Sequence, residues 1–114
     1  MTIREFCKKY NLHDSLLEQI EICSDNKTAK LTVDFCYWQQ NGYDDSEQET
    51  GIVFIVFSDL INISYDNHPL NSDEIISCEV DKDGNMIMQL ESDITRSYHT
   101  LMISSKNVEM IETP

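Results

Sequence analysis

The densest group of side chains able to do chemistry is an acidic segment at residues 43–49. It contains four acids within six positions: Asp44, Asp45, Glu47 and Glu49. No lysine or arginine lies between residues 36 and 57. Carboxylates at this density complement a cationic partner surface, with Tyr43 as an aromatic anchor. A solvated loop whose charges protect a sheet edge from aggregation explains the same residues, and the sequence leaves both interpretations open.

The acids do not by themselves predict an enzyme. A glycosidase needs two carboxyl groups held ~5–9.5 Å apart across a cleft, and a flexible acidic loop is poor support for such a pair. Tyr37, Trp38 and Tyr43 could form a sugar-stacking surface, but we expect Tyr37 to lie in the core. We therefore expect no catalytic residues and no cofactor.

Two shorter motifs have both a chemical and a structural interpretation. The sequence LHDS at residues 12–15 places an imidazole, a carboxylate and a hydroxyl side by side. A catalytic triad gathers these groups from separate elements, and adjacent strand residues such as His13 and Asp14 point to opposite faces. The sequence DKDGN at residues 81–85 lacks the calcium loop's glycine at position six and its glutamate at position twelve. We interpret the first motif as turn or cap chemistry and the second as a hairpin turn.

The composition limits the class of protein. A chain of 114 residues with 40% hydrophobic side chains can form one domain, residues 1–114, with one core. Its 21 acidic and 8 basic residues give a net charge of −13, which argues against binding nucleic acid or an anionic membrane. The polar amino terminus lacks the apolar region of a signal peptide, so we expect a cytoplasmic protein.

The cysteines do not predict a metal site. Cys7, Cys23, Cys36 and Cys78 form no CxxC pair and have no histidine at zinc-binding spacing. Reduced thiols are expected in the cytosol, and two disulfides are the less favoured alternative.

The elements that must position these groups are mostly strands. Residues 2–10 carry apolar side chains at helical spacing behind a Thr2 cap, which predicts a short helix. Residues 11–27 are ambiguous, because Ser15 and Glu18 could form a helical capping box, but the later alternation favours a strand from about residue 16. Residues 31–37 alternate clearly. Residues 52–57 are apolar on both faces, which predicts a central strand covered on both sides.

The remaining elements form hairpins. Asp83-Gly84 predicts a turn between two strands, with one face made of Ile76, Cys78 and Val80 before the turn and Met86, Met88 and Leu90 after it. A last pair of strands is expected at residues 98–103 and 108–111. The fold class is therefore α+β: an antiparallel sheet of about six or seven strands with one short N-terminal helix. The acidic segment becomes a connection of about ten residues between two strands.

The stretch LHDSLLEQIEICSDNKTAKLTVDFCYW resembles small bacterial proteins that begin with a Leu-His-Asp-Ser element followed by a strand, a polar turn and an alternating strand. Several proteins of this type belong to toxin–immunity loci, including contact-dependent growth inhibition systems. The resemblance covers about the first third of the chain. It implies an immunity protein that binds and neutralises one cognate toxin domain, such as a nuclease with a basic surface.

The residues we expect to contact that partner lie in two predicted loops: Tyr43, Asp44, Asp45, Glu47 and Glu49 in the first, and Asp66, Asp73 and Glu74 in the second. The sequence does not tell whether the two loops share one end of the sheet. It also leaves the oligomeric state open. The alternative function is a non-catalytic β-rich module that binds a small ligand or forms a homodimer.

Overall fold

A single antiparallel sheet closes on itself to form the body of the protein. The structure is a computed structural model that describes residues 1–66 and 68–113, and these contain one short helix and six antiparallel strands. This confirms the α+β class with a mainly antiparallel sheet. The elements are α1 (Ile3–Lys9), β1 (Leu16–Cys23), β2 (Thr28–Cys36), the 3-10 helix η1 (Tyr37–Gln39), β3 (Thr50–Ser64), β4 (Asp73–Val80), β5 (Met86–Glu91) and β6 (Tyr98–Glu112).

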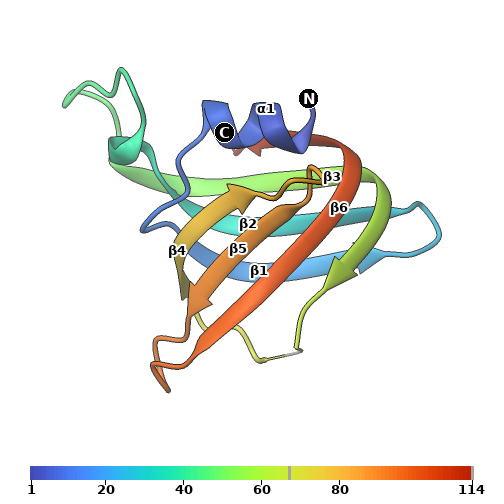
Figure 1. Cartoon of the computed structure of the whole chain (residues 1–114). Coiled ribbons are helices and arrows are strands. Elements are labelled where there is room, and N and C mark those ends of the chain that lie inside the picture. Colours follow the sequence, from blue (N-terminus) through green and yellow to red (C-terminus); the bar gives the residue numbers. More distant parts are fainter. Residues whose placement is uncertain (67, 114) are drawn as a thin grey trace.

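The strands are ordered β1-β2-β3-β6-β5-β4, and contact between β1 and β4 closes the barrel (Figure 1). That closure is short, because only Leu16 with Glu74 and Leu17 with Asp73 are paired. The rest of β1 pairs with β2 on one side and is not paired with β4 on the other. One end of the barrel wall is therefore open between β1 and the segment that precedes β4.

Alternating side chains from the strands fill the barrel. The inward positions of β2 and β5 are fully buried, as their period-two patterns predict: Leu31, Val33, Phe35, Met86, Met88 and Leu90. The outward positions of the same strands are only partly buried, except Cys36 at the end of β2, which is also buried. Gly84 takes φ +86° in the turn between β4 and β5, where a residue with a Cβ would be strained.

Strands β3 and β6 differ from what the sequence predicts. In β3, Val53 and Ile55 are fully buried but Ile52 is 39% exposed. The expectation that this strand is covered on both sides is wrong, since a barrel buries only its inner face. The expected pair of strands at residues 98–103 and 108–111 is one continuous strand, β6, which pairs with β3 along most of its length.

A register shift in β4 also breaks the predicted pattern. Ile75 points into the core and the pairing with β5 shifts between Ile75 and Ser77. After the shift, Cys78 and Val80 pack against the core. The prediction that Ile76 shares their face is therefore wrong, because the extra residue of a bulge inverts the alternation.

Helix α1 covers one end of the barrel, as Figure 1 shows. Thr2 caps it, accepting a hydrogen bond from the Glu5 backbone while the Glu5 side chain accepts one from the Thr2 backbone. Ile3 and Phe6 are buried against the core. The predicted helix is confirmed, and its apolar stripe closes the barrel end nearest both chain termini.

Hydrogen bonds of the LHDS motif hold the start of β1 against β2 and β4. Ser15 is fully buried, and its Oγ accepts a hydrogen bond of 3.0 Å from the Cys36 backbone on β2. On the other side, the Asp14 and Ser15 backbones bond to Ile75 on β4, and His13 Nδ1 donates to the Ile76 carbonyl at 2.7 Å. This accounts for the motif as structural.

One detail of that motif contradicts the sequence argument. His13 Nε2 and Asp14 Oδ1 lie 3.4 Å apart, although adjacent strand residues were expected to point apart. Asp14 takes φ +69° before β1 begins, and this left-handed conformation turns its side chain back toward His13. The Asp14 carboxyl also accepts a hydrogen bond from the Gln39 amide at 2.8 Å.

Candidate functional site

The acidic loop, residues 43–49, connects η1 to β3 and projects from the barrel (Figure 1). The connection is about as long as the sequence predicts. Its four acids are exposed: Asp44, Asp45, Glu47 and Glu49. In the part of the chain that the structure describes, none of them forms an ion pair. The negative charge of the loop is therefore directed at solvent.

Hydrogen bonds within the loop give it a defined shape. The Asp44 carboxyl accepts a hydrogen bond of 2.9 Å from the Ser46 backbone, and this bond lowers the pKa of Asp44. Tyr43 Oη donates to the Glu47 carbonyl at 3.1 Å. Asp44 thus shapes the loop, while no hydrogen bond of the described chain occupies the carboxyls of Asp45 and Glu49.

An exposed tryptophan lies beside these acids. Trp38 is 46% exposed, and its backbone donates a hydrogen bond to the Glu49 carbonyl at 3.2 Å. A hollow of about 420 Å³ is lined by Trp38, Tyr43, Asp45 and Glu49. Partial burial raises the pKa of Tyr43, and the nearby carboxylates raise it further. Aromatic faces beside carboxyl groups suit a lysine or arginine side chain.

The second predicted acidic patch does not form as expected. Asp73 and Glu74 are the first residues of β4, not part of a loop, because they pair with β1 to close the barrel. Asp73 is fully buried and Glu74 is half-buried. Only Asp66 is on the surface, with 53% of its side chain exposed. It follows the far end of β3, so the two predicted regions lie at opposite ends of that strand.

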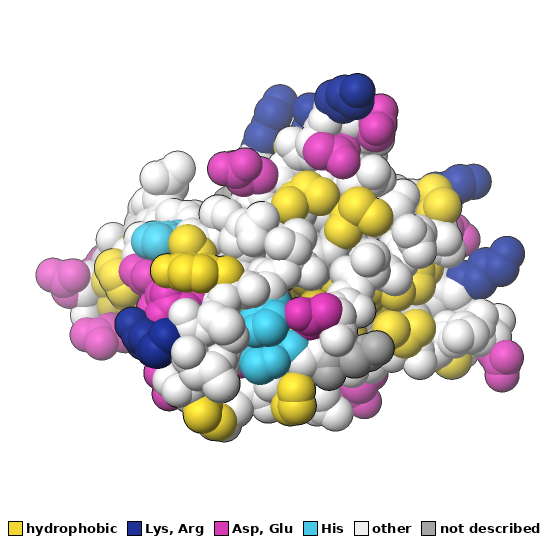
Figure 2. Space-filling view, turned by 60° about the horizontal axis from the view of Figure 1, so that its bottom comes forward, with side chains coloured by type: hydrophobic (Ala, Val, Ile, Leu, Met, Phe, Trp, Pro, Cys, Tyr) yellow, Lys and Arg dark blue, Asp and Glu magenta, His cyan; other side chains and the backbone are white. Residues whose placement is uncertain are grey.

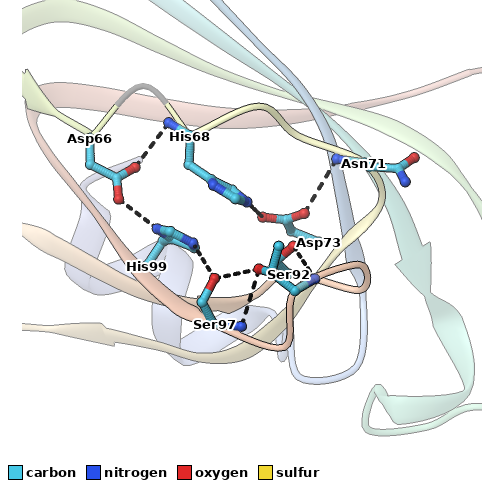
Figure 3. Close-up of polar contacts among 8 residues, drawn as sticks. Asp66, His68, Asn71, Asp73, Ser92, Ser97 and His99 are labelled. Atoms are coloured by element: carbon cyan, nitrogen blue, oxygen red, sulfur yellow. Dashed lines mark hydrogen bonds and ion pairs between the residues drawn. The ribbon is translucent and has the colours of Figure 1, made fainter.

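Asp66 belongs to a group that we call the histidine cluster: Asp66, His68, Asp73, Ser97 and His99. The imidazole rings of His68 and His99 stack with centroids 3.7 Å apart and an interplanar angle of 17°. Asp66 Oδ2 lies 2.5 Å from His99 Nδ1, and this hydrogen bond lowers the pKa of Asp66. Figure 3 shows the cluster tying the segment before β4 to the start of β6.

The Asp66, His99 and Ser97 side chains are connected in the order of a nucleophilic triad. His99 Nε2 lies 2.9 Å from Ser97 Oγ, so the imidazole bridges a carboxylate and a hydroxyl. Ser97 Oγ is also 2.6 Å from the Thr95 hydroxyl, and Ser97 does not line the neighbouring cavity. A nucleophile needs a substrate cavity beside it, so we interpret this chain of bonds as structural. Sequence reasoning found no partner for either His68 or His99.

That neighbouring cavity, the side pocket, lies where the barrel wall is open. It encloses about 430 Å³ and is lined by Glu18, Gln19, Ile20, Ile22, Ile63, Tyr65, His68 and Leu70. Figure 2 shows this face, with adjacent histidine side chains and hydrophobic side chains beside them. Burial, with the charges of Asp73 and Asp66, raises the pKa of Tyr65 to about 12. The phenol therefore stays protonated at neutral pH.

Several buried polar atoms around the side pocket lack hydrogen-bond partners among the described residues. They are Glu18 Oε1, Tyr65 Oη, His68 Nε2 and Asp73 Oδ2. His68 Nε2 and Asp73 Oδ2 are 4.0 Å apart, beyond hydrogen-bonding distance. The sequence offers no signal for this arrangement, since the four residues come together only through tertiary structure.

The cysteines form no disulfide within the described residues. Cys7, Cys23, Cys36 and Cys78 are all free. Cys7 and Cys78 share a polar hollow between α1 and β4, and a hydrogen bond between their thiols lowers the pKa of Cys7 and raises that of Cys78. Within residues 1–66 and 68–113, no group of three histidine, cysteine or acidic side chains could hold a metal ion.

Comparison with protein-family models, with curated proteins and with solved structures finds no match for this chain. Among the described residues, no helix has the length and apolar character needed to cross a membrane. The function must therefore be argued from the geometry of the two ends of the molecule.

Proposed function

We propose that this protein is a cytoplasmic immunity protein, which binds and neutralises a cognate bacterial toxin domain through its acidic loop. The observation that carries the proposal is the hollow beside Trp38. An exposed tryptophan adjoins carboxyl groups of Asp45 and Glu49 that are unpaired within the described chain. Tryptophan is among the residues that dominate binding energy at protein interfaces.

The charge of the chain supports a basic partner. A net charge of −13 repels nucleic acid and attracts a protein with an exposed basic surface. A nuclease presents such a surface to its own substrate, and the carboxylates of an inhibitor can occupy the place of the phosphates. The four loop acids would steer the encounter, and Trp38 would slow dissociation by burying apolar area.

The shape of the loop supports the same role. The hydrogen bonds of Tyr43 and Asp44 fix the loop before any partner arrives, which reduces the entropy lost on binding. An acidic loop that served only to keep the protein soluble would gain nothing from a fixed shape or from an exposed Trp38.

The experiment is co-expression of this chain with the protein domain encoded immediately upstream, which is tested as the toxin. We expect cells to survive only when the wild-type chain is present, and the two proteins to purify together. A variant with Trp38→Ala, Asp45→Asn and Glu49→Gln should fail to protect, whereas the matched variant Asp25→Asn, in the turn between β1 and β2, should protect fully. Equal protection by both variants would remove the acidic loop from the interface.

A size measurement on the isolated chain separates this proposal from a homodimer. An immunity protein of this type needs no second copy, and the chain should then elute near 13.3 kDa. Elution at twice that mass, with no effect of co-expression, would favour the homodimeric module instead.

A further inference from the structure

We propose that the side pocket is a binding site for a small organic ammonium ion with an apolar tail. This site is separate from the acidic loop and does not depend on the proposed immunity function. It is carried by the polar side chains that line the cavity and have buried atoms without partners, and by the apolar side chains that line the same cavity.

The unpartnered atoms are the first part of the argument. Burying a polar atom without a hydrogen bond costs free energy, so native proteins pair nearly all such atoms. Here the side chains of Glu18, Tyr65 and His68 line one cavity, and each has a buried atom without a hydrogen-bond partner within the described chain: Glu18 Oε1, Tyr65 Oη and His68 Nε2. Unmade bonds concentrated on one cavity indicate a ligand that completes them.

The chemistry of these atoms selects a hydrogen-bond donor with a positive charge. A carboxylate only accepts hydrogen bonds, while a phenol oxygen and the free nitrogen of a neutral imidazole can also accept. A primary ammonium group carries three N–H donors, which suit the Glu18 carboxyl and the Tyr65 phenol, while His68 Nε2 lies 4.0 Å from the Asp73 carboxyl. The buried carboxyl of Asp73 lies beside His68, which itself lines the cavity (Figure 3).

The apolar walls select the rest of the ligand. Ile20, Ile22, Ile63 and Leu70 line the same cavity, and side chains of this kind favour a hydrocarbon tail over a hydrated metal ion. A metal ion is further disfavoured because no suitable group of three ligands exists among the described residues. A volume of about 430 Å³ is typical of small-molecule sites.

The fold explains why a site can exist here. β1 pairs with β4 only through Leu16 and Leu17, and the side pocket begins at the next residue, Glu18. Ser72 holds the other oxygen of Glu18 by a hydrogen bond of 2.9 Å. The side pocket thus lies at the gap in the barrel wall, and Ser72 keeps the Glu18 carboxyl in place.

The test is a titration of the full-length ¹⁵N-labelled protein at pH 8 with n-pentylammonium chloride, followed by NMR and calorimetry. We expect saturable shifts confined to the amides of residues 18–22, 63–66, 68 and 70. n-Pentanol and pentanoate, which match the tail but not the charge, should bind far more weakly. Methylammonium should also bind weakly, since each buried methylene contributes up to about fourfold in affinity.

Two variants connect the binding to named atoms. Glu18→Gln should raise the dissociation constant of pentylammonium about tenfold or more, because it removes a charge-assisted hydrogen bond. Glu21→Gln, on the same strand but paired with Lys30 at 3.2 Å, should leave it unchanged. Circular dichroism and a thermal melt show whether each variant is folded.

Three results would overturn the proposal. Equal binding of methylammonium and pentylammonium, or shifts spread over the whole acidic surface, would indicate nonspecific attraction of cations. Folded Glu18→Gln binding pentylammonium as tightly as the wild type would remove the carboxyl from the site. Tighter binding of Nα-acetyl-lysine methylamide than of pentylammonium would assign the pocket to a lysine side chain of a partner protein.

Discussion

The two ends of β3 carry unpaired polar groups of opposite kinds. At Thr50 the acidic loop exposes carboxyl groups to water, where leaving them unpaired costs little. Beyond Ser64 the side pocket buries polar atoms without partners, where the cost is high. The first arrangement suits a surface that attracts a large partner from a distance, and the second suits a cavity that a small ligand completes at short range.

The largest effect is expected from removing the loop charge. Neutralising Asp44, Asp45, Glu47 and Glu49 together should slow association with the toxin domain by about 10- to 1000-fold at low salt, because steering is lost. Stopped-flow or surface plasmon resonance at two salt concentrations measures this. The salt dependence should largely disappear, and binding of pentylammonium to the side pocket should not change. An unaltered association rate and salt slope would contradict the role of the loop.

Truncating Trp38 should act on the rate of dissociation from the toxin domain, not on the rate of association. Trp38→Ala is expected to speed dissociation by about 30-fold, equivalent to roughly 2 kcal/mol, while association changes little. Ile94→Ala, another exposed hydrophobic side chain far along the chain, is the matched control and should have no effect. If both variants dissociate at the wild-type rate, Trp38 lies outside the interface.

A substitution at Asp73 tests whether its buried carboxyl is an unpaired group or a structural partner. Asp73→Asn keeps the oxygen that accepts a 3.3 Å hydrogen bond from the Asn71 backbone but removes a buried carboxyl whose other oxygen has no partner. We expect the free energy of unfolding at pH 8 to rise by about 1 kcal/mol, or roughly 4 °C in melting temperature. Glu74→Gln, its half-buried neighbour, should change stability by less than ~0.5 kcal/mol. A lower melting temperature for Asp73→Asn would mean that its carboxyl is a structural partner.

The smallest effect is expected on the stability of the protein at acidic pH. The hydrogen bond from His99 lowers the pKa of Asp66 in the folded state. The Asp66 carboxyl therefore takes up a proton more readily in the unfolded chain than in the folded chain. The stabilisation of the folded state by Asp66 is fully present above the ordinary pKa of 3.8. It is lost as the pH falls through the lower pKa that Asp66 has in the folded state. When the melting temperature is plotted against pH, it should therefore fall less steeply between pH 5 and pH 2.5 for Asp66→Asn than for the wild type. Parallel curves would show that this bond is not maintained in solution.

Elements governed by neighbouring residues were predicted correctly. The Thr2 cap of α1, the alternation of β2 and the Asp83-Gly84 turn depend on contacts within a few positions. The position of the acidic loop follows from the strands on either side of it. Trp38 was recognised as a neighbour of the acids, but only the structure shows that it lines a hollow with them.

Features governed by register were not predictable in the same way. A bulge at Ile76 inverts the faces of β4, and pairing of Leu17 with Asp73 turns that acid inward. Neither has a local signal, because a shift of one residue moves every later side chain to the other face. The stacking of His68 on His99 likewise depends on segments 31 positions apart.

The sequence by itself therefore determined the class of fold, the surface charge and the place where that charge is concentrated, since each depends on composition or on short-range periodicity. Tertiary structure alone decided that the sheet closes through two residue pairs and leaves a gap beside Glu18. That outcome depends on how β1, β4 and the end of β3 meet in space. The acidic loop could be found from the sequence, whereas the side pocket could be found only in the folded molecule.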